Sequence, residues 1–194
     1  MALVLWAAWC SPLHADEDGE GGGGVDEGPS SVRINEKMVH YAIVADSIDE
    51  LRERLREQVP PASAHGHTSS DVGIAYEFET STAGCRLHRL EVRLDIVVTL
   101  PEWKPPRAVP DAQWQHWEQA LAALQRHEAF HRGNARAAAE QARVRILGIG
   151  VQPDCRTLRN TASRLLRRTM LKYEFRDRRY DARTGSGATE GAVL

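Results

Sequence analysis

Two histidines with a glutamate between them stand out as residues that could do chemistry: His127-Glu128-Ala129-Phe130-His131, the pattern H-E-x-x-H. Residues four apart on an α-helix lie on the same face, so both imidazoles can reach a single metal ion. Glu128 would stand beside the first histidine, where it can take a proton from a water molecule without being a ligand. The pattern therefore predicts a zinc hydrolase with His127 and His131 as ligands and Glu128 as general base.

The sequence around the motif predicts one long amphipathic helix that starts with Asp111 as its N-cap. Apolar residues recur there at spacings of three and four, and the motif continues their stripe, which comprises Trp114, Trp117, Leu121, Leu124, His127, Glu128, His131, Ala135 and Ala138. The alternative is a histidine pair with a purely structural role. Unpaired polar groups are costly at core-facing positions, so the place of the histidines on this stripe favours metal binding.

A catalytic zinc ion takes three protein ligands and a water molecule, so a third ligand must come from elsewhere in the chain. Glu140 lies on the same helix but about two and a half turns beyond His131, which is too far along the axis of a continuous helix. Glu174 lies near the end of the following helix. Asp181 is slightly favoured, because the Tyr180-Asp181 pair in a glycine-rich tail has little structural reason to be there, and Tyr180 could donate a hydrogen bond to a developing oxyanion.

The composition predicts one globular domain with a substantial core. The chain has 194 residues, of which 42% are apolar and 27% charged, and its formal net charge is −2. This net charge is too small to favour nucleic acid or an anionic membrane as a partner. The expected partner is a peptide or protein substrate. Residues 156–183 are rich in arginine, which is typical of a solvated helix face.

The N-terminal sequence predicts export to the periplasm or the medium. Residues 1–15 resemble the apolar part of a secretory signal ending at Ala15, and they are too few to span a bilayer. Lipid anchoring at Cys10 is a minor alternative, because the preceding Trp9 is bulky. Residues 16–31 are an acidic, glycine-rich linker, and residues 32–194 form the predicted catalytic domain.

Two cysteines, Cys85 and Cys155, remain once such a signal is removed. In an exported protein an isolated pair most simply forms a disulfide, which here closes a loop of about 70 residues and contributes about 4 kcal/mol to stability. Zinc ligation by the thiolates is the alternative. It is weaker, because neither cysteine lies at short ligand spacing from another cysteine or histidine.

The remaining patterns predict an α+β fold. Residues 38–44, 72–79 and 87–100 read as strands of a small, half-exposed antiparallel sheet, and Leu90, Val92, Leu94 and Ile96 should share its inner face. Ser47 and Glu50 are placed as a capping box at the start of a short helix. Residues 62–70 and 101–110 read as loops. An H-x-H pair, His65 and His67, could bind metal but is more typical of exposed polar sequence.

A second long helix should begin near Asp154, with Leu158, Ala162, Leu165, Thr169 and Tyr173 on its inner face. Beyond Arg176 the pattern predicts a non-helical tail. The two long helices are then expected to pack on one side of the sheet.

Most of residues 38–194 resemble an uncharacterised bacterial family, a domain of unknown function described as predicted secreted zinc-dependent proteases. The matching segments are HYAIVADSIDELRERL, Cys85 with the strand ending in Leu100-Pro101-Glu102-Trp103, Trp117 through His127-Glu128-Ala129-Phe130-His131, and Tyr180-Asp181-Ala182-Arg183-Thr184. The resemblance implies an exported, zincin-like α+β domain that binds Zn²⁺ through both histidines and uses Glu128 as catalytic base.

The chain departs from the family pattern at Ser186, where the family has a histidine. A serine hydroxyl is a poor zinc ligand, so a metal site that needs this histidine would be weakened, whereas activity would survive if the histidine only orients substrate. Two further hypotheses follow. The chain could be an exported binding module that kept the scaffold and lost the chemistry, or a structural zinc protein, which would need a fourth protein ligand.

Overall fold

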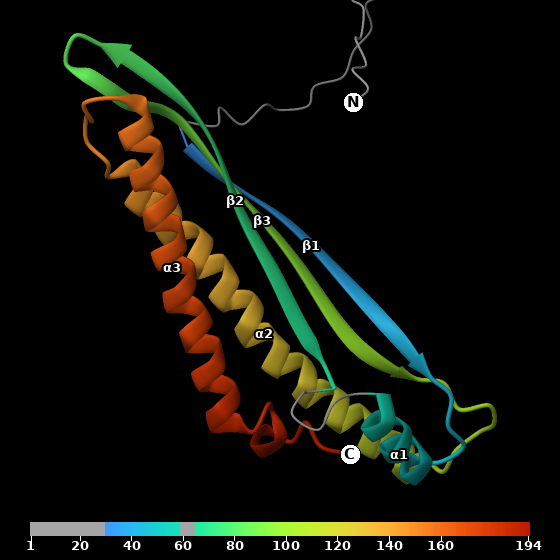
Figure 1. Cartoon of the computed structure of the whole chain (residues 1–194). Helices are drawn as coiled ribbons and strands as arrows, with labels where there is room; N and C mark the ends of the chain where they lie inside the picture. The colour runs from blue at the N-terminus through green and yellow to red at the C-terminus, as the bar shows by residue number, and fades with distance from the viewer. Residues whose placement is uncertain (1–29, 59–64) are drawn as a thin grey trace, which may run out of the picture.

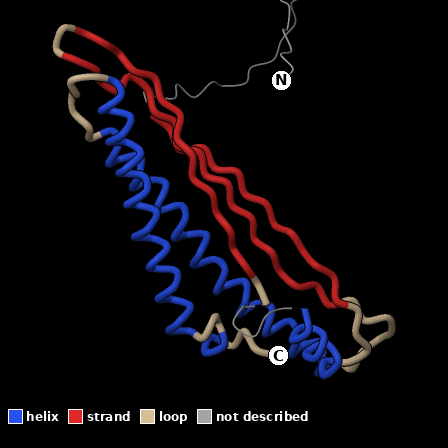
Figure 2. Tube along the Cα trace, viewed as in Figure 1, coloured by secondary structure: helices blue, strands red, loops and turns tan. Residues whose placement is uncertain are grey.

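The computed structural model describes residues 30–58 and 65–194. The predicted signal segment, Cys10 and nearly all of the predicted linker lie outside these residues. In chain order the elements are β1 (Ser30–Ile43), α1 (Ile48–Gln58), β2 (His67–Ser81), β3 (Gly84–Trp103), α2 (Asp111–Leu147), α3 (Cys155–Thr184) and the short 3₁₀ helix η1 (Ala188–Glu190). The fold is α+β, as predicted, and the molecule is elongated along its strands and long helices (Figures 1 and 2).

The sheet has three strands in the order β1-β3-β2, with β3 in the centre. β2 pairs with β3 antiparallel, but β1 pairs with β3 parallel, so the sheet is mixed and the prediction of an antiparallel sheet is wrong for β1. The reason is the path of the chain. It reverses once between β1 and β2 and again at the turn before Gly84, whose positive φ of 125° suits a residue without a side chain. β3 therefore runs in the direction of β1.

All three strands are longer than the sequence pattern predicts. β1 starts at Ser30, β2 includes residues 67–70 of the predicted loop, and β3 continues through Trp103 into the second predicted loop. Cross-strand pairing extends them, because His67 pairs with Thr99 and Trp103 pairs with Ile43. Trp103 is also buried, and its indole N–H donates to the carbonyl of Ala45.

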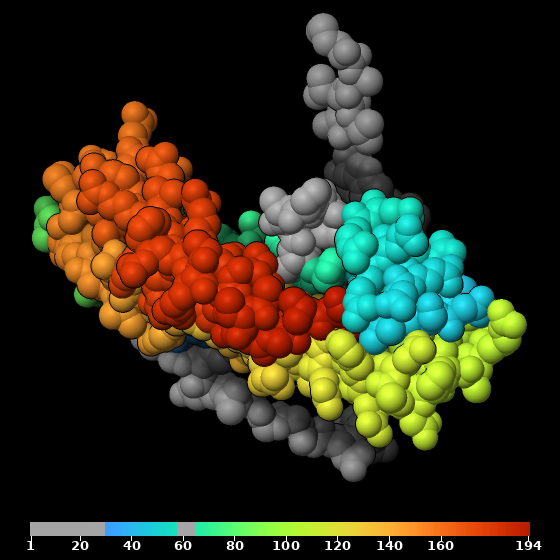
Figure 3. All heavy atoms as spheres, turned by 90° about the horizontal axis from the view of Figure 1, so that it is seen from below, coloured from blue at the N-terminus to red at the C-terminus, as the bar shows by residue number. Residues whose placement is uncertain are grey.

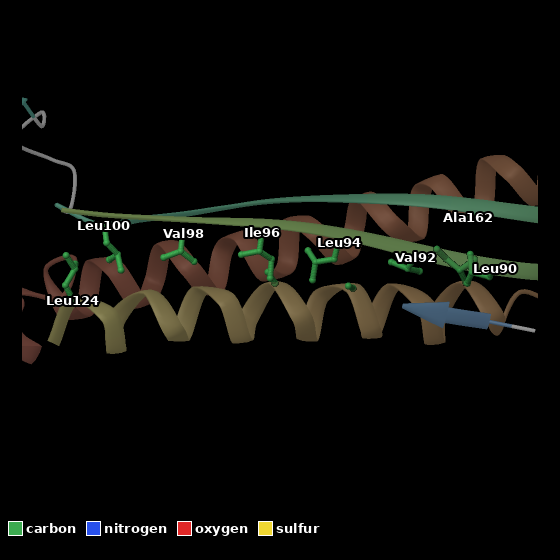
Figure 4. Packing of buried hydrophobic residues seen from close by; sticks show 11 residues of the cluster. Leu90, Val92, Leu94, Ile96, Val98, Leu100, Leu124 and Ala162 are labelled. Atoms are coloured by element: carbon green, nitrogen blue, oxygen red, sulfur yellow. The ribbon is translucent and has the colours of Figure 1, made fainter. Parts of the chain in front are cut away.

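The main core lies between one face of the sheet and the two long helices, as predicted. The alternating residues of β3 are 0–2% exposed: Leu90, Val92, Leu94, Ile96, Val98 and Leu100. Small residues of α2 and α3, including Ala135, Ala139 and Ala162, let the helices approach this row closely (Figure 4). A second cluster joins Leu51 and Leu55 of α1 to Trp103 and Trp117.

The helix ends differ from the predictions in two places. α2 begins at Asp111 with Pro110 as its N-cap, so Asp111 is the first helical residue rather than the cap. α3 begins after Asp154, whose side chain caps Thr157, but it continues to Thr184, and the predicted non-helical tail is wrong up to that residue. Tyr180 and Thr184 are buried one turn apart, which continues the inner face of α3 past Tyr173.

The predicted disulfide is confirmed: Cys85 and Cys155 are bonded, with their Cα atoms 5.1 Å apart. It joins the start of β3 to the start of α3. Among the described residues, no helix combines the length and apolar character needed to cross a membrane.

Candidate metal centre

Helix α2 places the two histidines of the motif side by side, as the four-residue spacing predicts. Their ring centroids are 4.9 Å apart, and the Nε2 atoms of His127 and His131 are 3.3 Å apart. His127 is 1% exposed, whereas 11% of the His131 side chain is exposed. Both imidazoles therefore direct the same nitrogen atom to one point at the border of the core.

Helix α3 brings Asp181 to that point. Its Oδ1 atom lies 3.2 Å from Nε2 of His127 and 2.9 Å from Nε2 of His131. Potential ligand atoms of these three residues all lie within 4.8 Å of one another. The Asp181 side chain is 40% exposed, so this side of the group is open to solvent. The residue favoured as third ligand from the sequence is thus the one that meets the histidines.

The outward nitrogen atoms of both rings contact carboxylates. Nδ1 of His127 lies 3.1 Å from Oε2 of Glu190, and Nδ1 of His131 lies 2.8 Å from Oδ1 of Asp177. Ionised carboxylates only accept hydrogen bonds, so Glu190 and Asp177 can each accept one from an Nδ1–H, while Asp181 can accept one from the Nε2–H of either ring. A cation bound between the rings and Asp181 would leave the proton of each ring on Nδ1 and would meet the lone pair of each Nε2.

Tyr180 ties the two helices to η1. Its ring stacks on Phe130, with centroids 3.7 Å apart, and on His127 at 4.8 Å. Its hydroxyl donates to Glu190 at 2.8 Å, rather than pointing freely toward a substrate as the oxyanion hypothesis requires. Burial, followed by the bond to Glu190, raises the pKa of Tyr180 to about 12. Tyr180 therefore holds the carboxylate that orients His127.

In this site, hydrogen bonds and neighbouring charges shift the pKa values of Glu190 and His131 in the direction opposite to burial. Burial raises the pKa of Glu190, but the hydrogen bonds with His127 and Tyr180 outweigh it, and the pKa lies below its ordinary value. Burial lowers the pKa of His131, but the bond to Asp177 and the charge of Asp181 outweigh it, and the pKa lies above its ordinary value. The cluster is thus a place where positive charge is stabilised.

The chain after α3 turns back over His127 through two glycines with positive φ, Gly185 at 56° and Gly187 at 90°. A Cβ at Gly187 would lie 3.2 Å from Cγ of His127 and 3.0 Å from Cβ of Ala192. The close approach of this backbone to the imidazole therefore requires glycine at position 187. Ser186 between them has φ 53°, and its backbone N–H donates to the carbonyl of Asp181. Figure 3 shows the C-terminal residues running from α3 toward α1.

Glu128 faces the start of β2 and is 2% exposed. Its Oε2 accepts a hydrogen bond of 2.7 Å from the Thr68 hydroxyl. The Gly66 backbone lies so close that a Cβ there would be 3.0 Å from Oε1 of Glu128. The carboxylate is therefore held in one position by β2.

The other candidates from the sequence lie elsewhere. Glu140 pairs with Arg143, and Glu174 pairs with Arg178, both on the helix surface. His65 and His67 do not belong to the three-residue group. His67 begins β2, and Nδ1 of His65 is buried with no hydrogen-bond partner among residues 30–58 and 65–194.

Sequence reasoning missed three residues that hold the site: Asp177, Glu190 and Thr68. Asp177 could have been found, because it lies one turn before Asp181 once α3 is taken to be continuous. Thr68 and Glu190 carry no such signal, because each reaches the motif from about 60 residues away.

The family model described as Bacterial protein of unknown function (DUF922) matches residues 38–188. The matched range includes both histidines, Glu128, Asp177 and Asp181, and it ends before Glu190. No curated protein and no solved structure matches the chain. Because the match covers most of its length, the chain belongs to the bacterial DUF922 family.

Proposed function

We propose that this protein is an exported zinc-dependent peptidase whose metal ligands are His127, His131 and Asp181. One observation carries the proposal. Two imidazole Nε2 atoms and a carboxylate oxygen face one another at 2.9 to 3.3 Å, while both Nδ1 atoms are engaged by other carboxylates. A metal cation among these three electron-pair donors would balance their mutual repulsion.

The donor set and its spacing fit zinc. Ligands at about 2.0–2.1 Å from a tetrahedral zinc ion are about 3.3 Å from one another, which is close to the separations in this cluster. Carboxylates on the outer nitrogen atoms of histidine ligands fix the ring orientation and raise ligand basicity. A structural zinc ion would need a fourth protein ligand, whereas three potential ligands gather here among the described residues. The exposed side of Asp181 supports a site with a position left for water.

The proposed reaction is hydrolysis of a peptide bond. Bound zinc would supply Lewis acidity that polarises the carbonyl group and lowers the pKa of water. Glu128 would accept the proton of the attacking water and pass it to the leaving amine, so the carboxylate is regenerated at the end of the cycle. The hydrogen bond from Thr68 would hold Glu128 in place for both transfers. The zincin-like resemblance and the disulfide support a peptidase of the periplasm or the medium.

The test is the substitution Glu128→Gln. The variant should retain about one zinc per chain by elemental analysis, because Glu128 is not a ligand, yet lose about 10²–10⁴-fold in turnover of unfolded protein or peptide libraries. His127→Ala and His131→Ala should lose the zinc. Unchanged zinc in both histidine variants would contradict the metal site, and full turnover in Glu128→Gln would contradict the mechanism.

A second candidate is a metal-binding module without turnover. The burial of Glu128 beneath Gly66 and Thr68 favours it, because the carboxylate has no open path to a substrate unless the start of β2 moves. Ser186 in place of the family histidine agrees with it. Under this alternative the wild-type chain binds zinc without hydrolysing peptides, and Ser186→His restores activity. Hydrolysis by the wild-type chain, lost in Glu128→Gln, excludes it.

A further inference from the structure

A surface pocket next to the candidate metal centre is lined by three arginines and two aromatic rings. It has a volume of about 240 Å³, and its lining residues are Phe130, Arg176, Arg179, Tyr180 and Arg183. Tyr180 is the wall shared with the metal centre, because the same ring stacks on His127 and its hydroxyl bonds Glu190. The pocket is therefore one side chain away from the candidate ligands.

Within the described part of the chain, no close ion pair neutralises the arginines of this pocket. α3 carries ten lysine and arginine residues and three acidic ones. The three acidic side chains are engaged, since Asp177 and Asp181 face the histidines and Glu174 pairs with Arg178. None of the three pocket arginines forms an ion pair with another described residue, so the pocket offers three guanidinium groups to an anion.

The arrangement of the arginines distinguishes between kinds of anion. Arg176, Arg179 and Arg183 follow one face of α3, and their backbones span about 10 Å at the helical rise of 1.5 Å per residue. This length equals about three residues of extended peptide. Arg183 also lies over the Tyr180 ring, with its guanidinium carbon 5.5 Å from the centroid, so its position is partly set by that contact. A row of this length suits several carboxylates along a chain better than a single small anion.

We propose that this pocket is a subsite for an acidic, extended segment of a peptide substrate. The inference rests on the proposed function, because it assigns a substrate class to that same site. Guanidinium groups pair with carboxylates through two parallel hydrogen bonds, and the faces of Phe130 and Tyr180 accept the aliphatic parts of the bound side chains. Acidic segments would thus be held beside the metal centre.

The experiment measures binding of fluorescein-labelled hexaglutamate to the chelator-treated protein by fluorescence anisotropy, with labelled hexaglutamine as the uncharged probe. Hexaglutamate should bind at least tenfold more tightly than hexaglutamine. Arg176→Gln/Arg179→Gln should weaken hexaglutamate binding by about five- to tenfold, as expected for the loss of two solvent-exposed charge pairs. The matched control is Arg164→Gln/Arg167→Gln, which removes the same charge at the same spacing on exposed positions of α3 outside the pocket. It should change the affinity less than twofold.

Equal weakening by both double variants would overturn the proposal, because binding would then follow the overall charge of α3. Equal affinities for hexaglutamate and hexaglutamine would also overturn it. If a thymidylate oligonucleotide of six nucleotides binds more tightly than hexaglutamate, the assignment to a peptide is wrong. The chelator is present throughout, so the peptide affinity does not depend on zinc binding or hydrolysis. Failure of the proposed function is detected separately, by the zinc content of the wild-type chain and by the turnover of Glu128→Gln.

Discussion

At the scale of single residues, the candidate centre depends on groups other than its three potential ligands. Glu190 and Asp177 contact Nδ1 of His127 and His131, which leaves Nε2 of each ring facing Asp181, and Tyr180 holds Glu190 in turn. The H-E-x-x-H motif by itself specifies the spacing of the rings but not their rotation or tautomer. The network around the motif orients the rings and offers an acceptor to the Nδ1–H of each.

We predict that Glu190→Gln raises the Kd for zinc by about 10- to 100-fold, the usual effect of removing a carboxylate behind a histidine ligand. A glutamine amide is neutral and increases the basicity of His127 less than a carboxylate does. The Kd is measured by competition with a chromophoric chelator. Glu174→Gln is the control, because Glu174 also accepts a charged hydrogen bond, from Arg178, and lies outside the candidate metal group. If both variants bind zinc like wild type, Glu190 has no role in the centre.

At the scale of elements, the end of α3 and the turn after it decide whether the centre forms. The extra two turns of α3 carry Asp177, Tyr180 and Asp181 to α2, and the turn through Gly185 and Gly187 brings η1 back over His127. Two glycines with positive φ stand in this turn, but their surroundings differ. This difference allows a matched pair of substitutions.

We expect Gly187→Ala to weaken zinc binding at least tenfold, because the new Cβ would lie 3.2 Å from Cγ of His127 and either the ring or the turn must shift. Gly185→Ala shares the left-handed backbone, but its Cβ would meet only Cβ of Ala188 at 3.6 Å. It should cost about 1 kcal/mol of stability and leave the zinc Kd unchanged. Zinc titration and thermal unfolding of both variants test the difference. Equal zinc affinities would show that the close contact with His127 is unimportant.

At the scale of the whole molecule, the covalent and the candidate metal cross-links lie at opposite ends of the long helices. Cys155 begins α3 and Asp181 lies 26 residues further on, which is about 40 Å along the helix axis. One cross-link joins α3 to the sheet, and the other would join α3 to α2 (Figure 1). The packed core between them separates the two sites.

Replacing both cysteines by serine should therefore lower the free energy of unfolding by about 2–4 kcal/mol without changing zinc affinity more than about twofold. The loss of stability comes from the loop of about 70 residues that the disulfide closes. Chemical denaturation of the chelator-treated protein measures the first effect, and zinc titration under native conditions measures the second. A tenfold loss of zinc affinity in the folded variant would mean that the two ends are coupled.

Short-range patterns in the sequence were sufficient for the features that depend on local geometry. The spacing of His127 and His131 follows from the helical repeat, and the alternation of Leu90 to Ile96 follows from the two-residue repeat of a strand. The disulfide followed from counting, because two cysteines remained for an exported domain. These features need no knowledge of what packs against them.

Only the tertiary structure decided the features that join distant segments. The parallel pairing of β1, the extension of α3 to Thr184, and the contacts of Thr68 and Glu190 with the motif depend on packing across about 60 residues of chain. The glycines of the tail predicted a non-helical segment after Arg176, but Tyr180 stacks on Phe130 of α2, and Tyr180 and Thr184 are both buried in a helix that continues to Thr184. Asp181 was named from its place in the sequence, but its approach to both histidines exists because that packing keeps α3 helical through this turn.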